Sequence, residues 1–197
     1  MDNPEESYRS FERTVNAFGI LNSEELDQFY ALFKPISYSR KSVLTEAGST
    51  EKYLYFVLEG VQRIVFQDDI GHEATILFTY QGNFGGVLDS MLTGRKTKYT
   101  YETLTKSTLL RANIKEVRDL GKIYPAINQL LFEGLLYAFS GLLERLVEIQ
   151  CYSAEEKFRI LLKRSPHILQ IVPHKYLANY IGIDATNFSK LLNSVKL

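Results

Sequence analysis

The segment from Tyr176 to Leu192 carries the most specific pattern of small, apolar and polar side chains in this sequence. Ala178 is small enough to lie where two helices cross, and Gly182, four residues later, can adopt the left-handed conformation of a tight turn. The pattern predicts a helix-turn-helix in which Asp184 caps the second helix. The positions that such a pair must bury are all apolar, namely Leu177, Ile181, Ile183, Phe188 and Leu191.

The second helix of this pair is the segment that could contact a nucleic acid. In helix-turn-helix proteins the early, outward residues of the second helix enter the major groove. Asn187 could pair with adenine, and Lys190 could contact a phosphate or a guanine. An antiparallel helix hairpin with a glycine turn and no nucleic-acid partner is the alternative. On the first interpretation, DNA contacts are expected from Lys175, Ala185, Thr186, Asn187, Ser189 and Lys190.

The charge distribution points weakly in the same direction. The chain has 23 basic and 23 acidic residues, but residues 154–197 hold seven Lys or Arg against three acids, and the remainder is acidic. A basic end on an acidic body is typical of a module that faces a polyanion. Surface lysines also serve solubility alone, so the charge is secondary to the pattern.

The residues before position 154 must position this C-terminal segment, and their pattern of residue types changes at two points. The stretch from Ser7 to Phe33 has mostly helical apolar spacing and predicts two short helices. From Ser37 to about Arg111, short segments rich in Val, Ile, Tyr, Phe and Thr are separated by glycines about every ten residues. With 45% hydrophobic residues in the chain, this spacing predicts an antiparallel sandwich or barrel with one good core.

After Pro125 the apolar residues recur every three or four positions for more than twenty residues. A helix of about 25 residues spans on the order of 37 Å, which is more than a small roll can cover. We therefore expect part of its apolar stripe to meet a second copy of the chain. The alternative is that the stripe packs entirely on its own roll. The expected homodimer contact consists of Leu131, Leu135, Ala138, Leu142, Leu146 and Ile149.

Four segments, in their order and spacing, resemble the Crp/Fnr family of bacterial regulators with a cyclic-nucleotide-binding-like sensor. They are Glu46–Gly48, Tyr55–Gly60, Gly82–Gly86 and Val172–Ile183. The resemblance implies an α+β fold with an N-terminal antiparallel β-roll sensor (double-stranded, jelly-roll-like), a long dimerisation helix and a C-terminal helix-turn-helix. The corresponding domain boundaries are 1–123 for the roll with its N-terminal helices, 124–152 for the long helix and 153–197 for the DNA-binding domain.

The resemblance also implies an effector site. Nucleotide-binding members use a glycine-glutamate pair to bind the ribose and a later arginine-serine pair to bind the cyclic phosphate. In this chain Gly86 stands at the position of the glutamate, and the position of the arginine falls at about Lys96-Thr97. Without these groups the ribose loses an acceptor and the phosphate its bidentate partner, so we expect a small effector other than cyclic AMP. The implied pocket residues are Phe84, Gly85, Gly86, Val87, Leu88, Lys96, Thr97 and Tyr99.

Other classes of function lack their parts. No nucleophile elbow, Walker loop or metal-ligand spacing occurs in the sequence, so no catalytic or metal-binding residue and no cofactor is assigned. The single cysteine, Cys151, excludes an intrachain disulfide and is expected to be a buried thiol near a helix end. No apolar run reaches about 20 residues and the start lacks a secretory pattern, so we expect a cytoplasmic protein without a membrane partner.

The sequence therefore favours a dimeric DNA-binding transcriptional regulator that senses a small effector, and not an enzyme. One departure from the resemblance concerns the recognition helix, where Ala185 and Lys190 stand in two places that relatives often fill with arginine. Direct guanine readout should be weaker as a result. The alternative is a dimeric ligand-binding sensor that acts through a protein partner without binding DNA.

Overall fold

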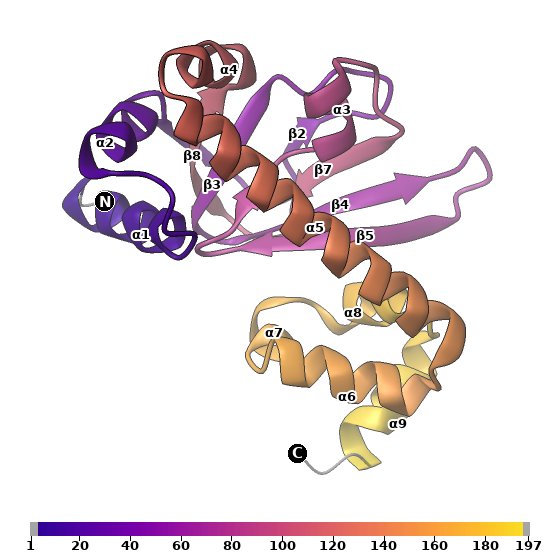
Figure 1. The fold of residues 1–197 in the computed structure, drawn as a ribbon. Helices are drawn as coiled ribbons and strands as arrows, with labels where there is room; N and C mark the ends of the chain where they lie inside the picture. Colours follow the sequence, from indigo (N-terminus) through magenta and orange to yellow (C-terminus); the bar gives the residue numbers. More distant parts are fainter. Residues whose placement is uncertain (1–3, 195–197) are drawn as a thin grey trace. The chain divides into compact units, whose positions relative to one another are not determined.

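The computed structural model describes residues 4–194 and divides the chain into two compact units (Figure 1). The roll unit contains the chain up to Ile64 together with Phe78–Leu136. The tail unit contains Val65–Leu77 and the chain from Tyr137 onward. The hairpin of residues 61–80 therefore begins and ends in the roll unit and has its tip in the tail unit, whereas the long helix of residues 125–151 begins in the roll unit and ends in the tail unit.

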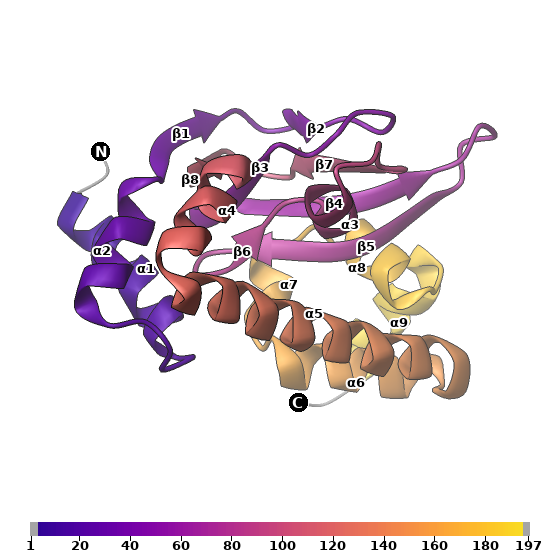
Figure 2. The same cartoon turned by 45° about the horizontal axis from the view of Figure 1, so that its top comes forward.

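The roll unit is built mainly from antiparallel strands, as the glycine spacing predicts. Strand pairing gives two four-stranded sheets, one in the order β1-β8-β3-β6 and the other in the order β2-β7-β4-β5, and Figure 2 shows the strands from a second side. The strands are β1 (Lys34–Tyr38), β2 (Val43–Thr45), β3 (Tyr53–Glu59), β4 (Val61–Gln67), β5 (Glu73–Tyr80), β6 (Phe84–Gly85), β7 (Tyr99–Thr103) and β8 (Ser107–Asn113). The helices before α5 are α1 (Pro4–Asn16), α2 (Ser23–Ala31), α3 (Leu88–Thr93) and α4 (Ile114–Ile123).

The core of the roll unit is aromatic. The ring of Phe11 on α1 lies 4.9 Å from that of Phe33, 5.2 Å from that of Phe56 on β3 and 5.6 Å from that of Phe84 on β6. Edge-to-face pairs of this kind add roughly 0.5–1.5 kcal/mol each beyond the burial of apolar area. The N-terminal helix is thereby fixed to β3 and β6.

The turn between β3 and β4 leaves no room for a side chain. Gly60 has a φ of +91°, and a Cβ atom there would lie 2.5 Å from the carbonyl oxygen of Lys106. The turn between β4 and β5 is different, because Gly71 has a φ of +89° but nothing within 4 Å of the Cβ position. Asp68 closes that second turn by accepting the backbone N–H groups of Ile70 and His72 at 3.1 and 2.8 Å.

The tail unit consists of helices and the distal half of the β4–β5 hairpin. The long helix α5 (Pro125–Cys151) ends in it, and α6 (Ala154–Arg164), α7 (Ile168–Ile171), α8 (His174–Ile181) and α9 (Ala185–Ser194) follow. Ser153 and Glu156 form a capping box at the start of α6. The buried rings of Phe158 on α6 and Phe188 on α9 meet edge to face at 5.3 Å and hold these helices together.

One prediction about the end of α5 is wrong. Cys151 is exposed, not buried. It is the last residue of the helix, and its neighbours Ile149 and Tyr152 are 48% and 40% exposed, so no layer of side chains covers this end. Among the helices within residues 4–194, none combines the length and the apolar character needed to cross a bilayer.

Candidate functional site

The α8–α9 pair is joined by a three-residue turn, Gly182–Asp184. Gly182 ends α8 with a φ of +67° and a ψ of 40°, the left-handed conformation that glycine adopts without strain. The N–H of Ile183 then donates to the carbonyl of Ala178 at 3.0 Å, which closes the helix end. Ala178 is only 2% exposed. The chain therefore turns sharply at the residues that the sequence pattern singles out.

Asp184 organises the start of α9. One of its carboxylate oxygens accepts the N–H groups of Thr186 and Asn187, both at 2.9 Å, and the other accepts the side-chain amide of Asn187 at 2.6 Å. The backbone hydrogen bond from Asn187 lowers the pKa of Asp184, and that from Thr186 adds to the effect. The amide of Asn187 is thereby held in a defined orientation.

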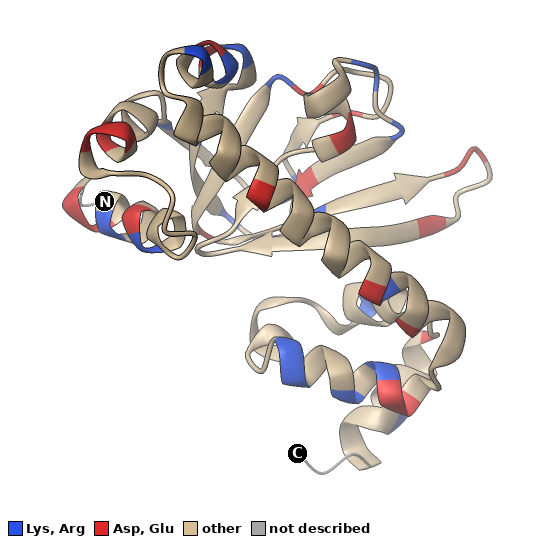
Figure 3. Ribbon diagram, in the orientation of Figure 1, with Lys and Arg blue, Asp and Glu red and all other residues tan. Residues whose placement is uncertain are grey.

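The outer face of α9 is open and carries little charge. Of the residues predicted to contact DNA, those on α9 are all exposed: Ala185, Thr186, Asn187, Ser189 and Lys190. Within the ten residues of α9, Lys190 is the only basic side chain, and Figure 3 shows more basic positions along α6. Lys175, at the start of α8, places its ammonium 4.5 Å from the centre of the Tyr176 ring.

A buried ion network connects α5 to the helices that follow it. Arg145 and Glu148 are 7% and 5% exposed, and Arg145 Nη1 lies 3.3 Å from a Glu148 oxygen. Arg164 at the end of α6 pairs with the other Glu148 oxygen. Arg145 also lies over the ring of Tyr180 on α8, and burial raises the pKa of that tyrosine. Sequence reasoning did not single out this network.

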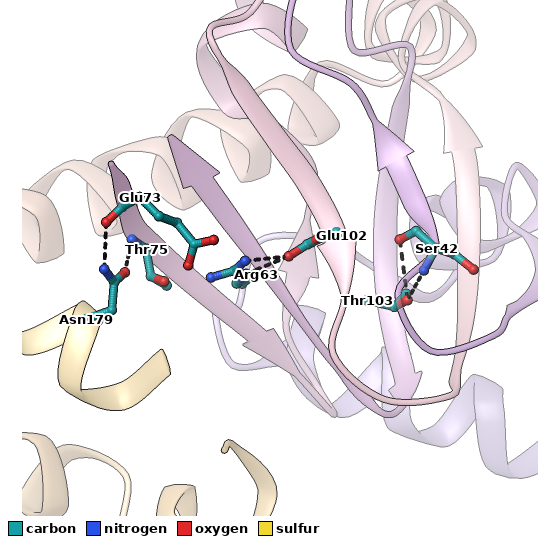
Figure 4. Close-up of polar contacts among 7 residues, drawn as sticks. All are labelled: Ser42, Arg63, Glu73, Thr75, Glu102, Thr103 and Asn179. Atoms are coloured by element: carbon teal, nitrogen blue, oxygen red, sulfur yellow. Dashed lines mark hydrogen bonds and ion pairs between the residues drawn. The ribbon is translucent and has the colours of Figure 1, made fainter. Parts of the chain in front are cut away.

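Asn179, the neighbour of Tyr180, contacts the β4–β5 hairpin (Figure 4). Its side-chain oxygen accepts the N–H of Thr75 at 2.6 Å, and its side-chain nitrogen donates to the carbonyl of Glu73 at 2.6 Å. Both strand atoms belong to the backbone of β5, which is an edge strand of its sheet. No periodic pattern signals such a contact, because the residues are 104 positions apart and the strand side chains do not take part.

Glu51 lies beside the segment predicted to bind the effector. Its carboxylate is buried, and one oxygen accepts the hydroxyl of Thr45 at 2.6 Å and the N–H of Val87 at 3.2 Å. The other oxygen accepts the N–H groups of Lys52 and Tyr53 at 2.9 and 3.0 Å. Four neutral donors thus satisfy this carboxylate. The N–H of Val87, which precedes α3, is one of the four donors.

Gly85 and Gly86 are closely surrounded. A Cβ at Gly86 would lie 3.0 Å from the carbonyl oxygen of Tyr53, and its φ is +124°, so a glutamate is strained at this position. A Cβ at Gly85 would clash with the hydroxyl of Tyr101. Burial raises the pKa of Tyr101, which keeps the phenol a hydrogen-bond donor.

A chain of polar side chains crosses the interior beside Tyr101. Its hydroxyl lies 2.9 Å from the hydroxyl of Thr79, which donates to the side-chain oxygen of Gln62 at 2.9 Å. Gln62 in turn donates to the hydroxyl of Ser107 at 2.9 Å. Elsewhere in the roll, Arg63 and Glu102 form an ion pair at 2.7 Å (Figure 4). The chain of hydrogen bonds from Tyr101 to Ser107 thereby links β4, β5, β7 and β8 inside the roll.

The other predicted effector residues lie in different surroundings. Phe84 belongs to the aromatic core, and Lys96 is exposed. Thr97 is buried, and its N–H donates to the carbonyl of Ser49 at 2.8 Å. An open hollow of about 630 Å³ is lined by residues 43–46 and 49–53, and the predicted effector residues are not among its lining.

The connection between β2 and β3 brings the two halves of the predicted effector segment together. Glu51 binds Val87 on one side, and Ser49 binds Thr97 on the other. Sequence reasoning did not single out Glu51. The available signal was a lone acid two residues ahead of a continuous apolar strand, which more often marks a solvated loop.

The distal part of α5 exposes an apolar face. Among the residues predicted to form a homodimer contact, Leu142, Leu146 and Ile149 are 49%, 51% and 48% exposed, whereas Leu131, Leu135 and Ala138 are half-buried. Leu143 and Val147 add 50% and 49% exposed side chains that the prediction did not include. A continuous apolar surface of this kind on a helix commonly marks a contact with another protein surface.

The strands of the roll and the glycine-rich segment before α3 lie in a region that is similar to a known family of domains. Residues 35–124 match the family model of the cyclic nucleotide-binding domain. That range runs from β1 to the residue that precedes α5 and includes Glu51, Gly86 and Thr97. No curated protein matches the chain. Within residues 4–194 no group of three or more His, Cys, Asp or Glu side chains could hold a metal ion.

Several solved structures share the fold over most of the chain. FixK2 from Bradyrhizobium japonicum is 13% identical, with 82% of this chain and 83% of that chain covered and a TM-score of 0.74. The c-di-GMP responsive global regulator CLP of Xanthomonas campestris is 16% identical, with 87% and 90% covered and a TM-score of 0.65. The catabolite activator protein of Thermus thermophilus is 19% identical, with 92% and 85% covered and a TM-score of 0.58. The chain therefore shares its fold with these three proteins.

Proposed function

We propose that the chain is a Crp/Fnr-type transcriptional regulator that binds duplex DNA as a homodimer. In this proposal residues 1–123 form the sensor, 124–152 the dimerisation helix and 153–197 a helix-turn-helix DNA-binding domain, and the protein acts in the cytoplasm, where its DNA is found. The shared fold with a global regulator and with a catabolite activator protein supports the assignment.

The observation that carries the proposal is the open face of α9. Gly182 turns the chain after α8, and Asp184 caps α9 so that its first turn is fixed while its outer side chains stay exposed. A recognition helix needs this combination, because its first turns must reach into the major groove. The proposed contacts come from Lys175, Ala185, Thr186, Asn187, Ser189 and Lys190.

The oriented amide of Asn187 defines the proposed base contact. Asp184 takes one N–H of the amide, which leaves its carbonyl oxygen and its other N–H for a base. One acceptor and one donor side by side match the N6 and N7 edge of adenine. Lys190, on the same helix, would contact a phosphate or a guanine.

The proposed sensor binds a small molecule other than cyclic AMP. The proposed pocket is formed by Phe84, Gly85, Gly86, Val87, Leu88, Lys96, Thr97 and Tyr99. Support for excluding the nucleotide comes from Glu51, whose carboxylate already occupies the N–H of Val87 and would repel a phosphate at this place. A catabolite activator protein and a c-di-GMP responsive regulator share the fold, so the fold itself does not fix the ligand.

The proposed dimer forms along α5, through Leu131, Leu135, Ala138, Leu142, Leu146 and Ile149. The exposed leucines of its distal part support this assignment. A twofold pair of helix-turn-helix domains reads two half-sites about one helical turn apart, so the expected operator is a palindrome.

Selection from a random duplex library, followed by fluorescence anisotropy, tests the function. We expect enrichment of a palindrome, and an affinity that falls steeply as salt rises. Asn187→Ala should weaken binding to the selected site about tenfold and relax the base preference at one position per half-site. Asn193→Ala, an exposed amide later on α9, is the matched control and should change affinity less than twofold. No enrichment and no retention on duplex DNA at near-physiological salt would refute the proposal.

A second candidate function is a dimeric sensor that acts through a protein partner. The observation that favours it is the charge of α9, whose ten residues include one cation and which Asp184 precedes. A negative group at this helix end disfavours a phosphate nearby. This candidate predicts no salt-dependent DNA binding, so the same selection separates the two functions.

A further inference from the structure

Helix α8 is held by two adjacent side chains that have different partners. Tyr180 lies against Arg145 of α5, within the buried ion network that includes Arg164. Asn179 contacts only backbone groups in the bonds described above, at Glu73 and Thr75 of β5. The first attachment is made of buried charges, and the second consists of two neutral hydrogen bonds.

The Asn179 amide makes the two hydrogen bonds that a neighbouring strand would make at this edge of the sheet. On the edge of a sheet, the carbonyl of one residue and the N–H of the second residue after it point outward together, and a strand added there would bind both. The carbonyl of Glu73 and the N–H of Thr75 form such a pair, and the Asn179 amide supplies the matching donor and acceptor at 2.6 Å each. An aspartate at this position could not supply both groups, because an ionised carboxylate has no donor.

We propose that Asn179 is a positioning residue that fastens the α8–α9 pair to the β4–β5 hairpin and sets the orientation in which α9 meets DNA. This inference rests on the proposed DNA binding. The fastened form is the binding-competent one, because α9 exposes its predicted contact face while both hydrogen bonds are made. Without them the pair must be ordered when DNA binds, which lowers the apparent affinity.

Strand β5 connects the Asn179 contact with the segment proposed to bind the effector. Thr75 and Thr79 are both on β5, and Thr79 bonds Gln62 and lies 2.9 Å from the Tyr101 hydroxyl. Tyr101 in turn lies against Gly85, in the segment proposed to bind the effector. A shift of β5 caused by an occupant of that segment would alter the geometry of the Glu73 and Thr75 backbone groups that Asn179 holds.

Hydrogen exchange of the full-length protein tests the contact without DNA. The Thr75 amide should be protected in the natural protein and should exchange at least tenfold faster in Asn179→Ala. Asn179→Asp keeps an acceptor for the Thr75 N–H but loses the donor to Glu73, so it should give an intermediate rate. Asn193→Ala should leave the rate unchanged. Equal Thr75 exchange in the natural protein and in Asn179→Ala would overturn the inference.

Binding to the selected duplex tests the positioning role. Asn179→Ala should weaken binding about tenfold with an unaltered base preference, because the side chains that read bases stay intact. Asn187→Ala, in contrast, should change the preference itself. If Asn179→Ala exchanges faster at Thr75 but binds DNA as tightly as the natural protein, Asn179 is a structural contact only and the inference is wrong. If the natural protein selects no duplex, the proposed function fails, whereas the exchange result still stands.

Discussion

The guanidinium carbon of Arg145 lies 3.9 Å from the centre of the Tyr180 ring, and this contact joins the long helix α5 to α8. Arg145 also pairs with buried Glu148, so one guanidinium contacts both a carboxylate and the face of an aromatic ring. Cations over aromatic rings gain more when they are shielded from water, as this one is. The contact explains how an arginine is tolerated within the apolar pattern of α5.

Replacing Arg145 by methionine should lower the free energy of unfolding by about 2–4 kcal/mol, because Glu148 stays buried with one of its two cationic partners missing. Urea denaturation at a fixed protein concentration measures the loss. Arg159→Met is the matched control, since Arg159 pairs with Glu155 at the surface and the pair is more than half exposed. The control should lose less than about 0.5 kcal/mol. Equal losses in the two variants would show that the buried network contributes nothing special.

Replacing Glu51 by glutamine should destabilise the protein by about 2–4 kcal/mol, because a glutamine amide cannot accept the hydrogen bonds of all four donors. Thermal and urea unfolding measure the change. Glu46→Gln, an exposed acid in the same connection, should be neutral. A neutral effect of Glu51→Gln would mean that water replaces the carboxylate and that the site is open.

Cyclic AMP should leave the melting temperature of the natural protein unchanged at millimolar concentration, because the buried Glu51 carboxylate holds the N–H of Val87. Differential scanning fluorimetry with cyclic AMP, with AMP as the matched control, measures the shift. A rise in melting temperature with cyclic AMP alone would contradict the assignment of Glu51 as the occupant of this place.

The Asp184 cap should make the stability of the tail unit depend on pH in the acidic range. The pKa of Asp184 is lowered in the folded state by its bond from the Asn187 N–H, so its contribution to stability is complete above the unfolded pKa and is lost as the pH falls through the lowered folded value. The carboxyl chemical shift of Asp184, followed by NMR between pH 2 and 5 (roughly the range in which carboxyl groups titrate), measures this pKa. Asp184→Asn retains an oxygen for the cap and should remove this part of the pH dependence. A carboxyl that titrates at its ordinary pKa would contradict the cap.

Replacing Leu146 by glutamate should dissociate the proposed dimer, since a charge would be buried in the contact between two copies of α5. Analytical ultracentrifugation over a range of concentrations measures the association constant, which should fall at least tenfold. Ile123→Glu places the same charge on an exposed apolar residue of α4, 70% exposed, and should leave association intact. A natural protein that is monomeric at all concentrations would refute the dimer.

Local chemistry made part of the molecule predictable. Gly182 and Ala178 could be recognised because a left-handed turn and a helix crossing each restrict the residue type at one position. The capping box of Ser153 and Glu156 is equally local. The strands follow from glycine spacing and β-branched or aromatic content, which need no knowledge of the partner strand.

The contacts that could not be predicted join a side chain to the backbone N–H or carbonyl group of a residue far away in the sequence. Asn179 binds backbone atoms 104 positions away, and Glu51 binds the N–H of Val87 36 positions away. Neither contact restricts the residue type at the partner position, so neither produces a recognisable sequence pattern. The burial of Arg145 was missed for a related reason, since its aromatic partner is on α8 and its acidic partner looks like part of a solvated surface.

The two tight turns at the two ends of β4 differ in how much change they can absorb. At Gly60 even one added methyl group would meet the backbone of the β7–β8 connection, so this corner cannot grow without moving a second strand pair. The tip at Gly71 faces open space and lies beyond the residues that Asn179 holds. Insertions, tags or fluorescent labels placed at Gly71 should therefore be accepted without disturbing either the roll or the tail, which makes this tip the natural position for a reporter of hairpin movement.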